Sequence, residues 1–353
     1  MSKRTTISDI AKVLGVSNTT VTKALNGKAQ VSDEMRSTVI KTAQKMGYRT
    51  NRSAQALVRK ETVLYFIYSR EPYEFNEYYG QGFEAALDEL ADFKVSGFLR
   101  PIKDMNAANE MRNILIELDS TKVDGIIMAP TVHSFEYIDE LRRLADKGIP
   151  IVYLCGKLAE VAEKGCVRLN SLVAGRTAAE FLSLTMREGR SSVIFANNKE
   201  LTVHKECISG YMAEAQARHL VVKGIYETQD DKEVAYYLAR KVINEIPDLG
   251  GIYVSSYNSV GVCNCIEDMN KKDDIIVIGQ DIYPELVKKL NSGSLRATLF
   301  QDQFNQARTA ALKIFDYITG TIDSIGDILV TPHIVLKSNL ECYDSGYLRT
   351  ERS

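Results

Sequence analysis

TISDIAKVLGVSNTTVTKALNGKAQVSDEMRSTVIKTAQKMGYRTNRSAQAL, residues 6–57, is the most informative stretch of this chain. Thr6 can cap a helix, and Asp9, three residues later, can complete a capping box. That helix ends at Gly15, and Ser17 can cap a second one. Two short helices joined by a glycine turn predict a helix-turn-helix.

A third helix follows the first two. Ser32 can cap it, Asp33 and Glu34 occupy its first turn, and Gly47 ends it. Its apolar stripe is Met35, Val39, Ile40, Ala43 and Met46, and with Ile10, Ala11, Leu14, Val21 and Leu25 this stripe predicts one small all-α core.

Charge is divided unevenly along the 353 residues. Residues 1–60 carry twelve Lys or Arg and three acids, a net charge of +9, whereas the remainder carries −11. A basic head on an acidic body indicates a head that contacts phosphate, and a solubilising basic face is the alternative. In a helix-turn-helix the second helix enters the major groove, which nominates Asn18, Thr19 and Lys23. Asn can pair with adenine and Lys can donate to guanine.

The same stretch resembles the DNA-binding head of the LacI/GalR family of bacterial regulators. The shared motifs are I-x-D-I-A, G-V-S, T-V-x-x-x-L-N, V-S-x-x-x-R and G-Y-x-x-N-x-x-A-x-x-L. The resemblance implies that residues 51–58 form a hinge helix on operator DNA, with Leu57 wedged into the minor groove. Two positions depart from the family pattern: Lys23 stands where Arg is more usual, and Thr50 replaces a proline. The expected DNA contacts are Thr6, Ser17, Asn18, Thr19, Thr20, Thr22, Lys23, Asn26, Arg52, Ala54 and Leu57.

Behind the head, apolar runs alternate with helical patterns. The strand-like runs are 62–68, 93–99, 124–129, 149–154, 192–196, 219–226, 251–255, 275–279 and 297–300. Continuous apolar strands alternating with helices predict parallel sheets covered on both faces, and this number of strands indicates two sheets.

The family resemblance extends this expectation to a two-lobed α/β domain of the periplasmic-binding-protein type (type I). It implies a head at 1–60 and an effector-binding and dimerisation domain at 61–353. Lobe 1 is then expected at 61–155 with 298–324, and lobe 2 at 156–290 with 328–342, joined by three crossovers.

Ligands of open α/β sheets bind beyond the carboxyl ends of the strands, so the loops there supply the candidate site. Tyr73 and Phe75 offer aromatic surface for a sugar ring. The polar candidates are Asn76, Thr131, Asn170, Lys205, Ser256, Asn258, Asp281 and Gln301. By resemblance, Asp281 and Gln301 match positions at which sugar-binding relatives hold hydroxyl groups. For the weaker candidates, the alternative is that the polar side chain only caps a helix.

Several family positions are altered at this expected site. Asn170-Ser171 and Ser255-Ser256 replace more usual Asp and Asn residues, and Cys207 lies where many members have an arginine. A carboxylate-bearing effector is therefore disfavoured, although Lys205 or Arg70 could supply a point charge. Family analogy favours a neutral, polyhydroxylated ligand such as a sugar.

Three classes of function remain to be compared. The alternative to a regulator is an intracellular sugar-binding or transport-type binding protein without a regulatory role. The polar start of the sequence predicts no export signal, so we expect a cytoplasmic protein. No apolar run is long enough to predict a membrane span. An enzyme is not expected, because the sequence contains no P-loop, G-x-S-x-G or H-E-x-x-H, and His204 is interpreted as a helix-start residue. The six cysteines are interpreted as reduced core thiols, and no metal or cofactor is expected.

The expected mechanism is that of a homodimer on a pseudo-palindromic operator, because a twofold protein places one recognition helix in each half-site. Closing the cleft on its ligand would change the distance between the paired hinges. Release of DNA by the ligand is the more common behaviour in the family, and corepression is the alternative.

Overall fold

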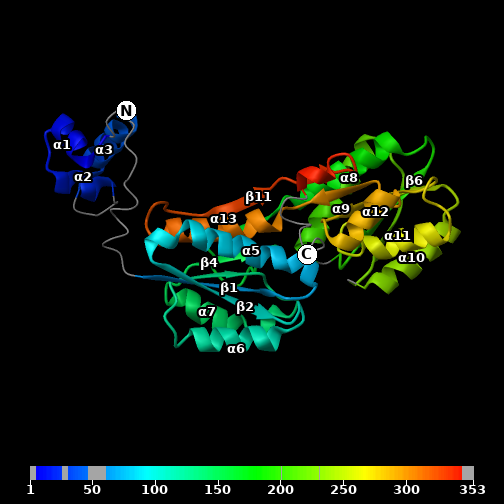
Figure 1. Ribbon diagram of the computed structural model, residues 1–353, viewed down its shortest axis with the longest axis horizontal. Helices are drawn as coiled ribbons and strands as arrows, with labels where there is room; N and C mark the ends of the chain where they lie inside the picture. Colours follow the sequence, from blue (N-terminus) through cyan, green and yellow to red (C-terminus); the bar gives the residue numbers. More distant parts are fainter. Residues whose placement is uncertain (1–4, 26–30, 47–60, 200, 230, 344–353) are drawn as a thin grey trace.

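The computed structural model describes residues 5–25, 31–46, 61–199, 201–229 and 231–343, without the side chain of Gln44. The expected hinge at 51–58, with Arg52, Ala54 and Leu57, lies outside these ranges, as do Asn26 and Gly47. Figure 1 shows a small helical head beside a larger body of two lobes. No helix in the described part of the chain is both long and apolar enough to cross a membrane.

The head consists of α1 (Ile7–Leu14), α2 (Asn18–Leu25) and α3 (Asp33–Lys45). The predicted capping box at Thr6 is present: its hydroxyl accepts from the Asp9 backbone N–H at 3.3 Å, and the Asp9 carboxylate accepts from the Thr6 N–H at 2.8 Å. Gly15 ends α1 in the left-handed conformation, with φ 66°, which glycine adopts at little cost. The helix-turn-helix is therefore confirmed.

A core of apolar side chains holds the three head helices together. Its buried members are Ile10, Ala11, Val21, Ala24, Val39 and Ala43. Ile40, expected in this core, is instead exposed. Val39 and Ala43 lie four residues apart on one face of α3, whereas Ile40 is rotated by about 100° from Val39.

Lobe 1 is built on a six-stranded parallel sheet with the order β11-β5-β4-β3-β1-β2. Its strands are β1 (Thr62–Ser69), β2 (Val95–Ile102), β3 (Gly125–Met128), β4 (Ile151–Leu154), β5 (Gly165–Leu169) and β11 (Gly326–Val330). The helices are α5 (Tyr73–Glu89) and α13 (Gln303–Ile318) on one face, and α6 (Ala108–Leu118) and α7 (Ile138–Asp146) on the other. Figure 1 shows these two helical layers on either side of the sheet.

Lobe 2 repeats the arrangement with the strand order β12-β10-β9-β8-β6-β7. Its strands are β6 (Ser191–Ala196), β7 (Val222–Glu227), β8 (Leu249–Val254), β9 (Ile276–Gln280), β10 (Ala297–Phe300) and the antiparallel edge strand β12 (His333–Val335). The helices are α8 (Ser171–Thr185) and α9 (Thr202–Ala217) on one face, and α10 (Lys232–Glu245), α11 (Ser259–Asp268) and α12 (Pro284–Ser292) on the other. The prediction of two α/β sheets is thus confirmed, and all their strands are parallel except the edge strand β12.

The three crossovers between the lobes differ from the expected boundaries. β5 pairs with β4 and β11 in the sheet of lobe 1, so residues 156–169 belong to lobe 1 rather than lobe 2. β10 pairs with β9 and β12, which places 297–300 in lobe 2 rather than lobe 1. β11 (326–330) likewise joins lobe 1. An apolar run identifies a strand, but its hydrogen-bonded neighbour decides the sheet that it joins.

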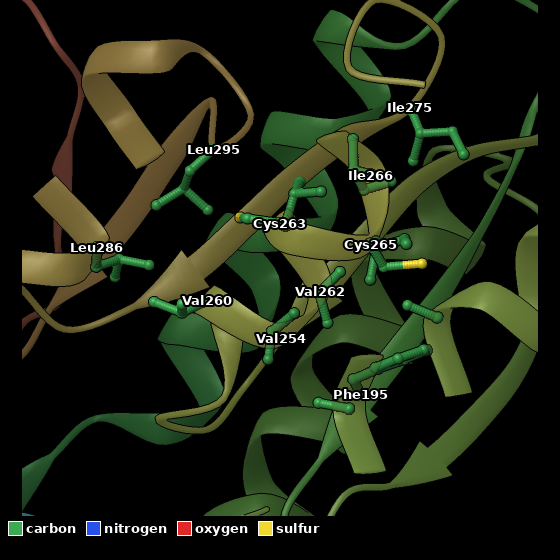
Figure 2. Packing of buried hydrophobic residues seen from close by; sticks show 14 of the residues in the cluster. Phe195, Val254, Val260, Val262, Cys263, Cys265, Ile266, Ile275, Leu286 and Leu295 are labelled. Carbon is green, nitrogen blue, oxygen red and sulfur yellow. The ribbon is translucent and has the colours of Figure 1, made fainter. Parts of the chain in front are cut away.

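All six cysteines were predicted to be core thiols, and most of them do lie in the cores. Figure 2 shows Cys263 and Cys265 on α11, among the buried side chains of Val260, Val262 and Ile266. All six cysteines are free, and Cys166, Cys207, Cys263 and Cys265 are buried. Cys342 is exposed, so the interpretation as core thiols is wrong for that residue, which follows the last strand of lobe 2.

Candidate functional site

Helix α2 presents a polar face away from the core of the head. Val21 and Ala24 are buried, whereas Asn18 and Thr19 are exposed and Lys23 is half-buried. At about 100° per residue, Asn18, Thr19 and Lys23 lie within an arc of roughly 140°. The three side chains nominated from the sequence thus share the face that a second helix of this motif turns toward DNA.

Several other expected DNA contacts have local structural roles. The Thr6 hydroxyl belongs to the capping box of α1, and the Ser17 hydroxyl accepts from the Thr20 backbone N–H at 3.0 Å. The Thr20 hydroxyl lies 2.9 Å from that of Ser17, and the Thr22 hydroxyl donates to the Asn18 carbonyl at 2.8 Å. These side chains shape α1 and α2, and they are exposed or half-buried.

A cleft of about 780 Å³ lies between the two lobes. Its size falls within the range of roughly 300–1,000 Å³ that is typical of small-molecule sites. Lobe 1 contributes Glu71, Pro72, Glu74, Phe75, Asn76, Asp104, Met105, Asn106, Ala129, Cys155 and Leu169. Lobe 2 contributes Ser171, Val203, His204, Cys207, Asp231, Lys232, Glu233, Ser255, Ser256, Tyr257, Asn258, Gln280 and Asp281, and Gln301 follows β10 at a crossover.

Asp281 is held rigidly in the cleft wall by its neighbours. Gln301 and Gln303 donate their side-chain amides to its Oδ1 atom at 2.7 and 3.0 Å. The Asp281 backbone N–H donates to Leu299, and Thr298 donates its hydroxyl to the Asp281 carbonyl at 2.7 Å. Asp281 itself adopts a positive φ of 72°, a conformation that Asp tolerates better than most residues. The carboxylate is therefore pre-oriented.

The segment after β8 supplies further polar groups to the cleft. Asn258 is fully buried and donates from Nδ2 to the Thr228 hydroxyl at 2.9 Å. Ser256 is 6% exposed, and its hydroxyl has no hydrogen-bond partner within the described chain. Buried hydroxyl groups are normally paired, so Ser256 offers an unused donor and acceptor at the cleft wall.

Tyr257 connects the two lobes across the cleft. Its hydroxyl donates to Glu74 of α5 at 3.1 Å, and its ring meets that of Phe75 edge-on at 6.4 Å between centroids. Within lobe 2, the ring stacks on Tyr283 at 4.3 Å, and the Tyr283 hydroxyl donates to the Tyr257 carbonyl. Burial, and then the negative charge of Glu74, raise the pKa of the Tyr257 hydroxyl, so it remains a donor at neutral pH.

The structure brings six of the ten expected effector contacts to the cleft and leaves four outside its lining. The six are Phe75, Asn76, Ser256, Asn258, Asp281 and Gln301. Asn170 caps α8 by accepting from the Val173 N–H at 3.2 Å, and Thr131 is occupied by hydrogen bonds to the Tyr137 hydroxyl. Tyr73 and Lys205 are exposed on α5 and α9. The helix-cap alternative therefore describes Asn170.

Several residues that line the cleft were not among the expected effector contacts. His204 and Cys207 lie one helical turn apart on α9, a spacing that places both on one face. Asp104, Met105 and Asn106 follow β2, and Asp231, Lys232 and Glu233 begin α10 after β7. All eight follow the carboxyl end of a strand, so the rule for open α/β sheets could have identified them.

Burial keeps one imidazole and two thiols of the cleft wall in their neutral forms. Burial lowers the pKa of His204 to about 4, and its Nδ1 lies 3.3 Å from the Ser255 hydroxyl. Burial raises the pKa of the Cys155 and Cys207 thiols to about 11 in each case. At neutral pH the wall thus presents an uncharged imidazole and two protonated thiols, none of them activated as a nucleophile.

Comparison with known proteins agrees with both parts of this structure. Residues 6–51 match the family described as bacterial regulatory proteins, lacI family, and residues 64–322 match the periplasmic binding protein domain. The HTH-type transcriptional regulator DegA of Bacillus subtilis is 27% identical over 289 residues, covering 79% of this chain and 82% of its own. KdgR of the same organism is 22% identical, covering 95% and 98%. The crystal structure of GanP, a glucose-galactose binding protein from Geobacillus stearothermophilus, superposes with a TM-score of 0.70 at 20% identity, covering 80% of this chain and 99% of its own.

The fold and the site together define a helix-turn-helix head joined to a two-lobed body of the periplasmic-binding-protein type. The chain belongs to the lacI family of bacterial regulatory proteins and is a DNA-binding transcriptional regulator. DegA and KdgR, two of the relatives that it matches, are by name transcriptional regulators.

Proposed function

We propose that this regulator binds a small carbohydrate in the cleft between its lobes and that the ligand controls its affinity for operator DNA. The cleft carries the proposal, because it combines a rigid carboxylate and amide with aromatic rings. Asp281 and Gln301 supply a hydroxyl-binding pair, and Phe75, with the edge of the Tyr257 ring beside it, supplies apolar surface for a sugar ring. GanP, which shares the fold, is by its title a glucose-galactose binding protein.

We further propose that the protein acts as a cytoplasmic homodimer on a pseudo-palindromic operator. Each chain has one helix-turn-helix, and a twofold dimer presents two recognition helices to two half-sites. Asn18, Thr19 and Lys23 would read base edges, and residues 51–58, including Leu57, would form the hinge that the family resemblance implies.

Coupling between the two sites requires that the ligand favour one arrangement of the lobes. The cleft is lined from both lobes, and the chain crosses between them after β5, β10 and β11. A ligand that contacts both walls therefore stabilises the closed arrangement and moves the start of β1, where the head is attached. Release of operator DNA on closure is the proposed sign of the response.

Catalysis and transport are less well supported than regulation. The protonated Cys155 and Cys207 and the neutral His204 are poorly suited to nucleophilic attack, which favours a binding protein that is not an enzyme. A transport-type binding protein has no use for a helix-turn-helix head with exposed Asn18 and Thr19.

The test begins with selection of duplexes from a random pool by the full-length chain. Fluorescence anisotropy then measures operator affinity at fixed salt, with and without glucose, galactose, maltose and related sugars. A preferred duplex whose affinity changes with one sugar supports the proposal. Selection of no duplex would exclude the regulatory role, and a preferred duplex that ignores every sugar would exclude the carbohydrate effector.

A further inference from the structure

The cleft is strongly acidic. Among the described residues that line it, six are carboxylates, one is a lysine, and His204 is neutral. The carboxylates are Glu71, Glu74, Asp104, Asp231, Glu233 and Asp281. Carboxylates that converge on a partly enclosed cleft create a negative potential that attracts cations and repels anions.

The single lysine does little to cancel this charge. Lys232 Nζ lies 2.6 Å from the carboxylate of Glu285, which is outside the cleft lining, and 5.6 Å from the centre of the Tyr257 ring. Lys232 is therefore already neutralised by an acid of its own lobe. Arg70 and Lys103, which neighbour Glu71 and Asp104 in sequence, do not line the cleft.

The hydrogen bonds of the cleft carboxylates come from uncharged donors. Glu71 accepts from the Tyr73 N–H at 3.2 Å, Asp104 from the Asn106 N–H at 2.8 Å, and Glu74 from the Tyr257 hydroxyl. Such donors stabilise a carboxylate without removing its charge. Within the described chain, none of these three carboxylates is in an ion pair with Lys, Arg or His.

At the start of α10, the negative charge of the cleft carboxylates is only partly offset. Asp231 accepts from the N–H groups of Glu233 and Val234, at 2.7 and 3.0 Å. The positive end of the helix offsets a fraction of the charge of Asp231 and Glu233. These two carboxylates also lack an ion pair with any described Lys, Arg or His, so the wall of lobe 2 adds to the negative potential.

Two further features indicate what the cleft binds. Ser256 is only 6% exposed, and its hydroxyl has no hydrogen-bond partner in the described chain. A ligand can therefore supply the missing hydrogen bond. Phe75 places an aromatic ring in the same cleft as the carboxylates, whereas the ring of Tyr257 is already stacked on Tyr283, with Lys232 Nζ 5.6 Å from its centre. Aromatic faces beside carboxylates are the surroundings that bind an ammonium group, through cation–π attraction and charge pairing.

We propose that the effector is a small hydroxylated molecule that carries a protonated amine, of the chemical class of an amino sugar, and that the cleft rejects sugar acids and sugar phosphates. This inference rests on the proposed function, because it describes the ligand of the same cleft. Cys207 is consistent with the rejection of anionic sugars, because no arginine stands at that position to bind an anion. Hydroxyl groups of the ligand meet Ser256, Asp281 and Gln301, and its ammonium group lies among the acidic side chains.

The test uses sugars that differ only in charge. The probes are glucose, glucosamine and glucuronate, with the corresponding galactose and mannose series, and binding to the full-length protein is measured by calorimetry at pH 7 and low salt. In at least one series the amine is expected to bind roughly tenfold more tightly than the neutral sugar. The acid of that series is expected to bind more weakly than both.

Neutral substitutions in the cleft should reduce the preference for the amine. Asp104→Asn and Glu233→Gln keep the size of the side chain, and each is expected to lower the ratio of amine to neutral affinity by about threefold. Asp146→Asn, an exposed acid on α7 outside the cleft, is the matched control and should leave the ratio unchanged. A ratio insensitive to both cleft substitutions overturns the inference.

The remaining outcomes separate this inference from the proposed function. A neutral sugar that binds as tightly as its amine, or an acid that binds best, overturns the amine assignment while the carbohydrate effector stands. Binding of none of the nine sugars overturns the amine assignment together with the carbohydrate effector. Operator affinity, measured separately, reports on the regulatory role in each case.

Discussion

The hydroxyl of Tyr257 in lobe 2 donates a hydrogen bond to the carboxylate of Glu74 in lobe 1, at 3.1 Å and across 183 positions of sequence. This bond spans the cleft, and the rings of Phe75 and Tyr283 both pack against Tyr257. A contact of this kind stabilises the arrangement in which the lobes are close together, before any ligand is bound.

Removing that bond should favour the open arrangement. Tyr257→Phe keeps the ring and deletes the donor, and the loss of one hydrogen bond is expected to cost the closed arrangement about 1 kcal/mol. Small-angle scattering of the ligand-free protein should show a larger radius of gyration. Tyr73→Phe, which alters an exposed tyrosine of α5 outside the cleft lining, is the control. Identical scattering from the two variants would show that Tyr257 does not hold the lobes together.

Asp281 provides a test of the proposed ligand site. Asp281→Asn keeps the size of the side chain, and asparagine is compatible with the positive φ of 72° at this position. The effector response of operator binding should be lost, because the charged acceptor is removed, while operator affinity without ligand should remain within twofold, as expected of a distant site. Anisotropy titrations measure both quantities. An unaltered effector titration would remove Asp281 from the site.

His204 should make the stability of lobe 2 depend on pH. Its pKa is lowered from 6.5 to about 4 by burial, so between these values the unfolded chain binds a proton that the folded chain does not. Stability is therefore unaffected above pH 6.5, falls as the pH decreases below it, and by pH 4 has lost about 3 kcal/mol.

Urea unfolding at pH 7.5, 5.5 and 4.5 measures this dependence. His204→Gln should flatten the decline between pH 6.5 and 4, whereas His133→Gln, at an exposed position, should leave it unchanged. If both variants decline as steeply as the parent protein, the proton uptake belongs to other groups.

Much of the architecture was predictable because it depends on local patterns. The capping box of Thr6 and Asp9, the glycine at position 15 and the apolar strands are all encoded within a few neighbouring residues. Asp281 and Gln301 were likewise predictable, since each follows an apolar strand at the edge where parallel sheets bind ligands.

What escaped prediction depends on contacts between distant segments. Residues 165–169 read GCVRL, a short run with an arginine, and become a strand only because β4 and β11 flank them. Nothing near Glu74 in sequence indicates that Tyr257 will meet it. Asn170 and Thr131 follow strands as Asp281 does, but their side chains are used by Val173 and Tyr137.

The packing of α8 against α9 depends on a glycine. A Cβ atom at Gly175 would collide with the backbone carbonyl of Cys207 on the facing helix, which cannot yield as a flexible side chain would. Gly175→Ala is therefore expected to force the helices apart and to destabilise lobe 2 by about 1–3 kcal/mol. Thermal unfolding measures the loss. Gly156→Ala, where a Cβ meets no atom within 4 Å, is the matched control, and equal melting temperatures for the two variants would contradict this account.

The polar face of α2 should determine which operator the protein selects. Asn18→Ala removes a side chain that can pair with adenine, and it is expected to cost about 1–3 kcal/mol of specific binding and to relax selection at one base pair. Lys23→Ala should weaken binding by a similar amount. Lys41→Ala removes the same charge from the exposed side of α3, so it separates base reading from general attraction to phosphate.

Affinities for the selected duplex and for a scrambled duplex, at fixed salt, provide the comparison. Lys23→Ala should lower the ratio of the two affinities, whereas Lys41→Ala should lower both affinities together or neither. Equal losses on both duplexes for Asn18→Ala and Lys23→Ala would mean that this face contacts only the DNA backbone, and another part of the head would then have to read the sequence.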